Sequence, residues 1–358
     1  SSDLRFDAPI EDVRRQIQEY EQYPDHLAEL NRANVRDQTP DRTLVDYEFT
    51  VETPVLNPTF EYCLRYRETD EGDLVFEAVD GDFPNVLGRW EFFEQGDQTL
   101  VVYTVWYDMS NPGWTLSTIF WAQPDYKVAL PVTRTAVEFE QLRRGITGDS
   151  VGEPENPETL PEAPDVPLFR GTSFPEESFR TLAEDGILLY VHPTQWIREN
   201  DHVLDFRFVT AIGLMEQSVD RTRESLTQFN RWSDFIDQVA SVDARKTEDG
   251  YEATWHLDLG VRLLPIDFQY TLRYQWKDDY SLPFRLVDGD LQYVYGGLEW
   301  VPVGDHRTLY FYTMTTQIGE KDSTLVKLGR LLPHFQIFVG VATGALAVRR
   351  KVDWMNES

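Results

Sequence analysis

An internal repeat is the feature that most constrains the fold of this chain. The segment 60–66 (FEYCLRY) returns 208 positions later as 268–274 (FQYTLRY), with five of seven residues unchanged. Further blocks recur at an offset of 208 or 209, namely 20–25 with 229–234, 88–92 with 296–300 and 99–104 with 308–313. A repeat that holds its offset over this length indicates two homologous domains in one chain.

Both copies show the same order of expected elements. Apolar residues at helical spacing over 9–30 and 218–239 predict two short helices in each copy. Six runs rich in Val, Tyr, Phe, Trp and Thr follow, separated by short turn-like gaps, and they predict an antiparallel meander. In the first copy these strands are expected at 33–39, 43–53, 58–69, 73–80, 86–94 and 99–108. A long helical segment then closes each copy, at about 115–145 and about 322–351.

The boundary between the copies is expected in an acidic, proline-rich stretch. Residues 148–168 lack any apolar period and are interpreted as a linker. We therefore expect a first domain over 1–147 and a second over 169–358 with an N-terminal extension. Within that extension the strand-like run 186–191 should pair with a sheet edge, because an exposed apolar strand promotes aggregation. We favour the edge of the first copy, whose own first strand at 4–6 is short.

Composition restricts the partners of the chain. Its 358 residues are 41% hydrophobic, enough to fill a core in each half, and its formal net charge is −29. Such a charge repels nucleic acid and anionic membranes, although transient membrane contact stays open. An acidic surface poor in lysine is typical of proteins adapted to high salt. The longest apolar stretch, 337–348, is shorter than the ~20 residues of a membrane-spanning helix, so we expect a soluble protein.

No motif for metal or cofactor chemistry is present. The single Cys63 cannot form an intramolecular disulfide, which leaves cytoplasm and periplasm equally open. None of the six histidines has metal-ligand spacing with another. Nucleophile-elbow, phosphate-loop and dinucleotide glycine patterns are all missing. We therefore expect no metal and no cofactor, assign no catalytic residue, and leave the oligomeric state open.

Three motifs point to a known superfamily. Ala8-Pro9, Tyr23-Pro24 and the stretch 83–90 (FPNVLGRW), in an order of two short helices, six strands and a long helix, resemble the START-like (SRPBCC) superfamily. That superfamily includes polyketide cyclases and coenzyme Q-binding and lipid-transfer proteins. The resemblance implies an α+β fold of tandem helix-grip domains. Each would be a curved antiparallel sheet around a long C-terminal helix, with two short helices after the first strand. The second copy departs from the motifs, with Gln217-Ser218 and Trp232-Ser233 in their places.

Alternation along the strands selects the inward face. A period of two places Phe60, Tyr62, Leu64 and Tyr66 on one face, together with their equivalents at 268–274. Taken alone, such residues are ordinary core. Arg65, Arg273, Glu91 and Glu299 fall on the opposite face, where solvated ion pairs are the expected role.

The resemblance implies that the inward faces line apolar cavities. Candidate ligand-binding residues are then Tyr62, Trp90, Phe92, Tyr103 and Trp121 in the first copy and Tyr270, Trp300, Phe311, Phe335 and Phe338 in the second. The glycine- and alanine-rich segment 335–346 leaves room for a ligand or merely packs closely. We favour binding or transport of a lipid such as a sterol, hopanoid, quinone or fatty acyl compound. A didomain aromatase/cyclase and a structural module with filled cores are the alternatives.

Overall fold

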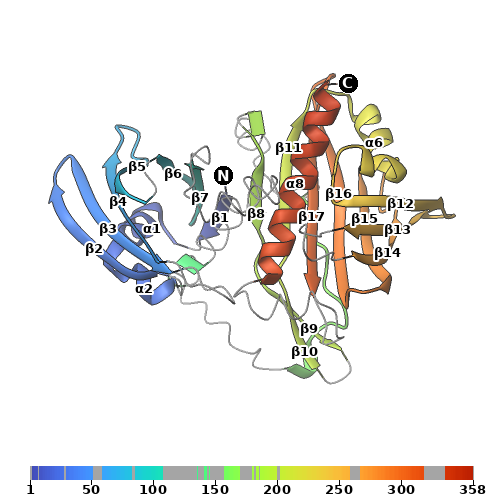
Figure 1. The fold of residues 1–358 in the computed structure, drawn as a ribbon, viewed down its shortest axis with the longest axis horizontal. Helices are drawn as coiled ribbons and strands as arrows, with labels where there is room; N and C mark the ends of the chain where they lie inside the picture. Colours follow the sequence, from blue (N-terminus) through green and yellow to red (C-terminus); the bar gives the residue numbers. More distant parts are fainter. Residues whose placement is uncertain are drawn as a thin grey trace. The chain divides into compact units, whose positions relative to one another are not determined.

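In the computed structural model the chain forms two compact units. The structure describes residues 2–50, 59–107, 157–169, 186–199, 202–258, 267–317 and 335–357, apart from 7, 28–29 and 83–84, and a few helical residues between 135 and 184. Described residues up to Gly145 belong to the first unit and those from Pro157 onward to the second (Figure 1).

The first unit is an antiparallel sheet with short helices between its first two strands. Strand β1 (Ser2–Phe6) leads into α1 (Ile10–Ile17), the 3-10 turn η1 (Tyr20–Gln22) and α2 (Tyr23–His26). The six strands of the meander follow as β2 (Leu30–Thr39), β3 (Arg42–Thr50), β4 (Thr59–Glu68), β5 (Leu74–Gly81), β6 (Val86–Gln95) and β7 (Gln98–Tyr107). Each observed strand starts and ends within three residues of its predicted bounds, since alternation and turn residues agree there.

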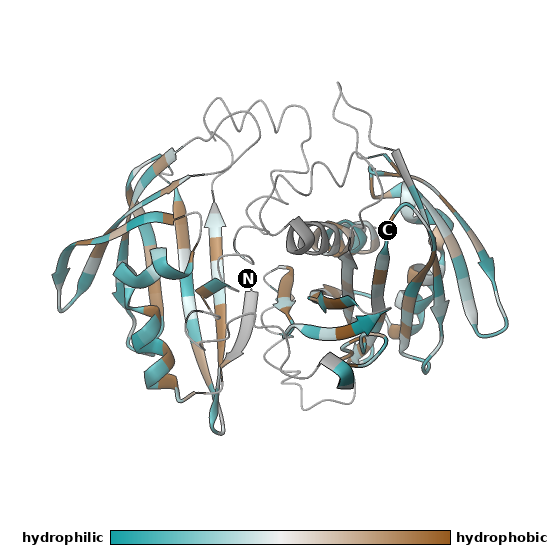
Figure 2. Ribbon diagram, turned by 90° about the horizontal axis from the view of Figure 1, so that it is seen from below, coloured by the Kyte–Doolittle hydropathy of each residue, from teal (hydrophilic) through white to brown (hydrophobic). Residues whose placement is uncertain are grey.

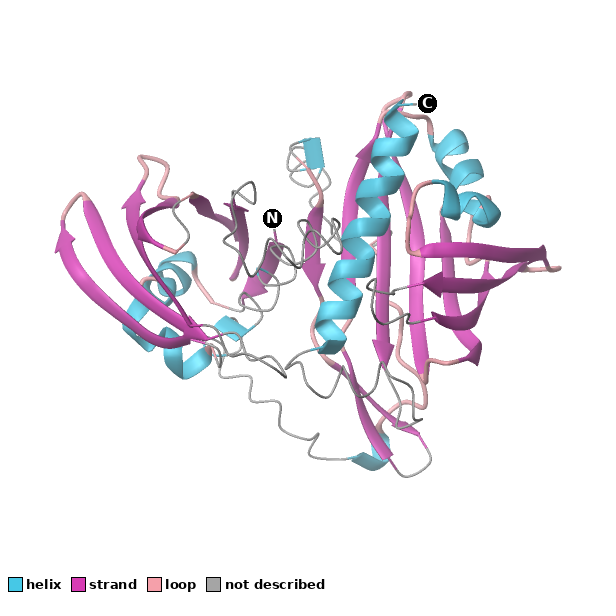
Figure 3. Cartoon of the chain, in the orientation of Figure 1, coloured by secondary structure: helices cyan, strands magenta, loops and turns pink. Residues whose placement is uncertain are grey.

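The second unit repeats this order of elements. Strand β11 (Val209–Met215) leads into α6 (Val219–Thr227) and the 3-10 helix η3 (Phe229–Asp234). The meander follows as β12 (Val239–Lys246), β13 (Gly250–Asp258), β14 (Asp267–Gln275), β15 (Ser281–Gly289), β16 (Tyr293–Val303) and β17 (Arg307–Gln317). Helix α8 (Phe335–Glu357) closes the unit (Figure 3).

Strand order and register confirm the repeat. The first sheet runs β1-β7-β6-β5-β4-β3-β2, and the second unit has the equivalent order β11-β17-β16-β15-β14-β13-β12. A β-bulge interrupts the register after Cys63 on β4 and after Thr271 on β14, again 208 positions apart. One position before each bulge, Tyr62 or Tyr270 pairs with the glycine that ends the next strand, Gly81 or Gly289, at φ +104° and +131°.

These two glycines make the same corner. A Cβ at Gly81 would lie 2.3 Å from the carbonyl oxygen of Glu61, and one at Gly289 would lie 2.4 Å from the Cα of Tyr270. The aspartate that follows each glycine accepts a hydrogen bond of 2.8 Å from the backbone N–H of Glu61 or Gln269. Only glycine fits a left-handed residue in such close contact with a neighbouring backbone.

Alanine at either corner should therefore be costly. We expect Gly81→Ala and Gly289→Ala each to lower the free energy of unfolding by about 2–4 kcal/mol, through backbone strain and steric overlap together. Urea unfolding followed by tryptophan fluorescence measures the loss. The matched controls are Gly96→Ala and Gly304→Ala, whose glycines have φ of +67° and +66° but no atom within 4 Å of an added Cβ. Equal losses at all four positions would mean that the close approach is unimportant.

Helix α8 covers the first strands of the second sheet. It lies over β11 and β17 (Figure 1), and a Cβ at Gly213 of β11 would meet Val348 at 2.7 Å and Val352 at 2.8 Å. The second unit thus has the expected long C-terminal helix. Most of the segment 115–145 lies outside the described residues, but Thr135, Gln141, Leu142 and Gly145 are helical.

The segment before the second copy packs on the second unit. Strand β8 (Leu188–Val191) pairs antiparallel with β11, while the first unit has its own first strand in β1. The hairpin of β9 (Gln195–Glu199) and β10 (His202–Phe206) follows β8. Part of the expected linker is also fixed, because the Arg198 N–H donates to the Pro161 carbonyl at 2.9 Å and Leu168 packs against Gly297.

Candidate ligand-binding faces

Each sheet has an inner face, covered by its helices, and an opposite outer face. Hydrophobic and hydrophilic residues alternate along the strands of both sheets (Figure 2). In the second unit the residues that contact α8, such as Ala211 and Tyr312, mark the inner face. By alternation and register the same face includes Tyr270 and Tyr274 of β14 and Phe284 of β15.

Aromatic rings line the inner face of the first unit. Tyr20 of η1 lies 4.4 Å from Tyr66, and Trp90 stacks on Tyr103 at 4.1 Å between ring centroids. The hydroxyls of Tyr47 and Tyr66 are hydrogen-bonded at 2.9 Å, and that of Tyr23 donates to the Ile17 carbonyl at 2.5 Å. Burial raises the pKa of Tyr47 and Tyr66 well above 10, so both stay neutral.

The second unit reproduces this arrangement with other residues. Phe229 takes the place of Tyr20 and lies 4.4 Å from Tyr274, the equivalent of Tyr66. Trp232 replaces Tyr23, and its indole N–H donates to the Leu226 carbonyl at 3.3 Å, as the Tyr23 hydroxyl does to Ile17. Because chemically different residues occupy equivalent places, each unit forms its own lining and can have its own preference for ligands.

Some rings of the inner faces keep accessible surface. Tyr62 in the first unit and Tyr270 and Tyr312 in the second are half-buried. Burial raises the pKa of Tyr270 and Tyr312 well above the ordinary value of a tyrosine, so both hydroxyls stay neutral. Gly344 of α8 faces Tyr312, and an added Cβ would be 3.6 Å from its ring. Room for a methyl group therefore remains between α8 and this part of the sheet.

The candidate residues divide into those on the inner faces, those outside the described residues, and Phe311. Tyr62, Trp90, Phe92, Tyr103, Tyr270 and Trp300 lie on the inner faces, and their contact with a ligand stays a prediction. Trp121 and the side chains of Phe335 and Phe338 lie outside the described residues.

The prediction for Phe311 was wrong. Phe311 pairs with Ile212 and stacks at 5.4 Å on Phe169, which lies on the outer face. In the run Tyr310-Phe311-Tyr312 alternation puts Phe311 opposite its neighbours, so the two tyrosines face inward.

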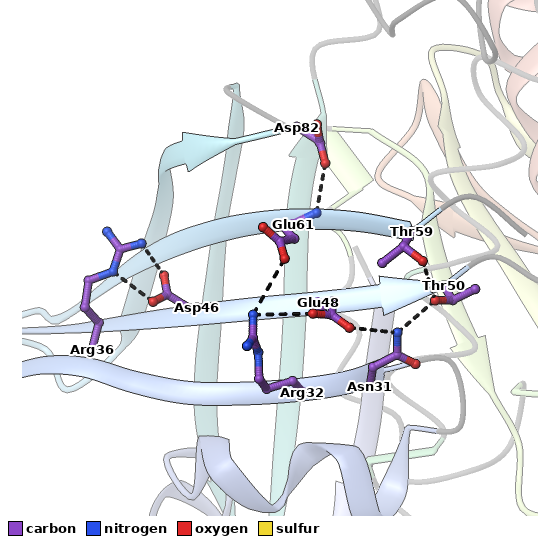
Figure 4. A network of polar contacts seen from close by, with 9 residues as sticks. All are labelled: Asn31, Arg32, Arg36, Asp46, Glu48, Thr50, Thr59, Glu61 and Asp82. Atoms are coloured by element: carbon purple, nitrogen blue, oxygen red, sulfur yellow. Dashed lines mark hydrogen bonds and ion pairs between the residues drawn. The ribbon is translucent and has the colours of Figure 1, made fainter.

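The outer face of the first unit carries ion pairs instead. Figure 4 shows Arg36 paired with Asp46 at 2.6 Å and Arg32 placed between Glu48 and Glu61 at 3.4 and 3.7 Å. Arg65 pairs with Glu77 at 2.6 Å, as expected for an outward arginine. Exposed ion pairs of this kind contribute little to stability. Because the polar side chains of this outer face pair with one another, the inner face is the better candidate for a ligand site.

A buried polar cluster on the outer face of the second unit was missed in the sequence. His192 Nε2 lies 2.7 Å from Thr210 Oγ1, which lies 2.7 Å from Thr313 Oγ1. Burial lowers the pKa of His192 to about 3, so its imidazole is neutral at physiological pH. Glu299 faces outward as expected but is fully buried, and it accepts a 2.9 Å hydrogen bond from the Phe169 N–H. These contacts attach the extension to the sheet.

Lys351 on α8 is a second residue that the sequence did not single out. It is fully buried, donates to the Ser225 carbonyl at 3.1 Å and lies 4.4 Å from the Phe235 ring and 4.5 Å from that of Trp354. In the first unit Gly145 packs on His26 as Trp354 packs on Phe235, 209 positions later. That offset makes the buried Leu142 the equivalent of Lys351.

The described residues include no cluster of three or more His, Cys, Asp or Glu side chains placed to hold a metal ion. Among the helices in the described part of the chain, none combines the length and apolar character needed to cross a membrane.

Comparisons with known proteins agree with this architecture. Residues 6–125 match the family model described as polyketide cyclase / dehydrase and lipid transport. No curated protein matched the sequence.

Three solved structures illustrate the likeness. TTHA0849 from Thermus thermophilus is 20% identical over 41% of this chain and 96% of its own, with a TM-score of 0.34. The aromatase/cyclase Zhui from Streptomyces sp. R1128 is 14% identical over 41% and 93%, with a TM-score of 0.33. The di-domain ARO/CYC StfQ from the steffimycin biosynthetic pathway is 10% identical over 99% of both chains, with a TM-score of 0.29.

The chain is thus an α+β protein of two repeated units, each with an aromatic inner face. The match over residues 6–125 agrees with the resemblance of the sequence motifs to the START-like (SRPBCC) superfamily.

Proposed function

We propose that the protein binds an apolar ring compound or lipid between the inner face of a sheet and the helix that covers it. The observation that supports this most directly is the accessible surface of Tyr270 and Tyr312, two aromatic residues on the inner face of the second unit. Aromatic rings that are incompletely packed on an inner face offer a stacking surface to a ligand.

The composition of the inner face supports an uncharged ligand. Inner-face positions of β15, β16 and β17 carry apolar, aromatic, hydroxyl-bearing, glycine or proline residues, from Leu282 to Thr316. A charged group placed there would lose its hydration without gaining a partner of opposite charge on these strands. The ligand is therefore a neutral molecule or one whose charged end stays at the surface.

We expect freshly purified protein to carry such a ligand and to bind a neutral dye in its place. Native mass spectrometry before and after organic extraction should show a loss of mass. Extracted protein should then enhance the fluorescence of N-phenyl-1-naphthylamine, a neutral probe that the net charge of −29 does not repel. An absence of both bound compound and dye enhancement would contradict the proposal and favour filled cores in both units.

Cyclisation of a reactive carbonyl chain is a second candidate function. Two units with the same strand order are the architecture expected of a didomain aromatase/cyclase, and the family description of residues 6–125 names polyketide cyclases. Binding a chain in a folded conformation would accelerate its ring closure by positioning the reacting carbons. Incubation of a poly-β-ketone with the protein, followed by aromatic absorbance, tests this function. If cyclisation is no faster with the protein than in buffer, the cyclase function is excluded and ligand binding remains the proposed function.

A further inference from the structure

Strand β17 of the second unit carries a row of hydroxyl groups on its inner face. Tyr310, Tyr312 and Thr316 all point to this face, because they alternate with outward residues and pair with inner positions of β16. Positions two apart on one face of a strand are separated by roughly 7 Å. Met314 interrupts the row, so Thr316 lies roughly 14 Å beyond Tyr312 along the same strand.

These hydroxyls have no partner among the residues that the structure describes. The Tyr310 hydroxyl and Thr316 Oγ1 are fully buried and make no hydrogen bond there. The Tyr312 hydroxyl likewise makes none with a described residue, and its ring stays half-buried. Buried polar groups are nearly always paired, and one without a partner destabilises the fold until a ligand or water supplies one.

The first unit differs at the equivalent places. Val101 on β7 replaces Tyr310, and elsewhere in the unit the hydroxyls of Tyr47 and Tyr66 are hydrogen-bonded to each other while that of Tyr23 donates to the Ile17 carbonyl. These three hydroxyls of the first unit therefore need no ligand to complete their hydrogen bonds. Among the described residues of the second unit, buried hydroxyls without a partner occur on β17 and also at Thr222 and Ser225 of α6.

We propose that β17 recognises oxygen, with Tyr310, Tyr312 and Thr316 hydrogen-bonding hydroxyl or keto groups of an otherwise apolar ring compound. This inference rests on the proposed function and adds to it which unit selects the ligand and by what chemistry. A hydrocarbon or plain acyl chain would leave the hydroxyls unpaired, whereas an oxygenated ring system both stacks on Tyr270 and pairs them.

Two probes that differ in one hydroxyl test the inference. Binding of naphthalene and 2-naphthol to extracted protein is measured by their own fluorescence. A purely apolar site prefers naphthalene, because the hydroxyl of 2-naphthol would lose its hydration. We expect the opposite order for this protein. In the double variant Tyr310→Phe/Thr316→Val, the affinity for 2-naphthol should fall about five- to tenfold, while that for naphthalene changes less than about twofold.

Stability and a control variant separate recognition from structure. Tyr310→Phe should leave the melting temperature of the ligand-free protein unchanged or raised, because its hydroxyl loses no partner. Tyr66→Phe removes a paired hydroxyl in the first unit, so it should lower the melting temperature without altering the preference for 2-naphthol.

The outcomes are distinguishable. Tighter binding of naphthalene by the parent, a preference for 2-naphthol retained by the double variant, or a lowered melting temperature of Tyr310→Phe would each overturn oxygen recognition by β17 and leave apolar binding intact. If neither probe binds, the proposed function fails along with the inference.

Discussion

Replacing Lys351 by leucine should stabilise the protein strongly near pH 6. Burial lowers the pKa of Lys351 to about 7, with a contribution from Arg231, while Asp234 opposes the shift. Against a pKa of 10.5 in the unfolded chain, keeping this ammonium buried costs at most about 5 kcal/mol. The nearby Phe235 and Trp354 rings offset part of that cost, at about 0.5–2 kcal/mol each. We expect Lys351→Leu to add about 2–3 kcal/mol to the free energy of unfolding.

The gain should depend on pH in a defined direction. Below pH 7 both the folded and the unfolded chain hold the proton, and the full cost of the buried charge is present. Between pH 7 and 10.5 the folded chain releases the proton first, so the parent becomes more stable as pH rises. The difference between Lys351→Leu and the parent should accordingly shrink from pH 6 to pH 10. Urea unfolding at both pH values measures it.

The first unit provides the precedent for this substitution, and an exposed lysine provides the control. Leu142 already occupies the equivalent position in the first unit, so leucine suits the packing of such a helix. Lys246 on β12 is exposed, and Lys246→Leu should change stability little at either pH. A loss of stability for Lys351→Leu at pH 6 would mean that the aromatic rings and Ser225 stabilise the ammonium by more than burial costs.

The strands and the repeat could be predicted from sequence because several signals agreed. Alternation, turn residues and a constant offset all indicated the same strand boundaries. The matching bulges after Cys63 and Thr271 show that the repeat extends to the register of the strands. The face of Phe311 was misjudged since three aromatic residues in a row conceal the alternation. Aligning Tyr103 with Tyr312 at the offset of 209 would have placed Phe311 outward.

Other features carried no local signal. Residues 161–168 are acidic and proline-rich, which is typical of a linker. Leu168 nevertheless packs on the sheet, because Gly297 has no side chain and leaves room for it there. Lys351 directly follows Arg349 and Arg350 in the polar last part of α8, so the sequence does not set it apart from its exposed neighbours. His192, Thr210 and Thr313 are far apart in sequence and meet only through strand pairing.

The position of Gly344 permits the most direct test of space beneath α8. An alanine Cβ at this position would make ordinary contacts of 3.6 Å with Ala211 and the Tyr312 ring. Its equivalent in the first unit is the buried Thr135, so the second unit has the smaller residue at this place. Gly344→Ala should therefore bind N-phenyl-1-naphthylamine like the parent and gain up to about 1 kcal/mol from helix propensity.

Leucine at the same position would extend from α8 into the space beside Tyr312. If that space holds the ligand, Gly344→Leu should keep a melting temperature close to that of Gly344→Ala, yet lose more than about tenfold in dye affinity through filling of the site. If the region is packed core, overpacking should instead cost about 1–3 kcal/mol. Dye titration and thermal unfolding of both variants decide between these cases. A large fall in melting temperature for leucine alone would show that the second unit is filled, and ligand binding would then have to involve Tyr62 and the inner face of the first unit.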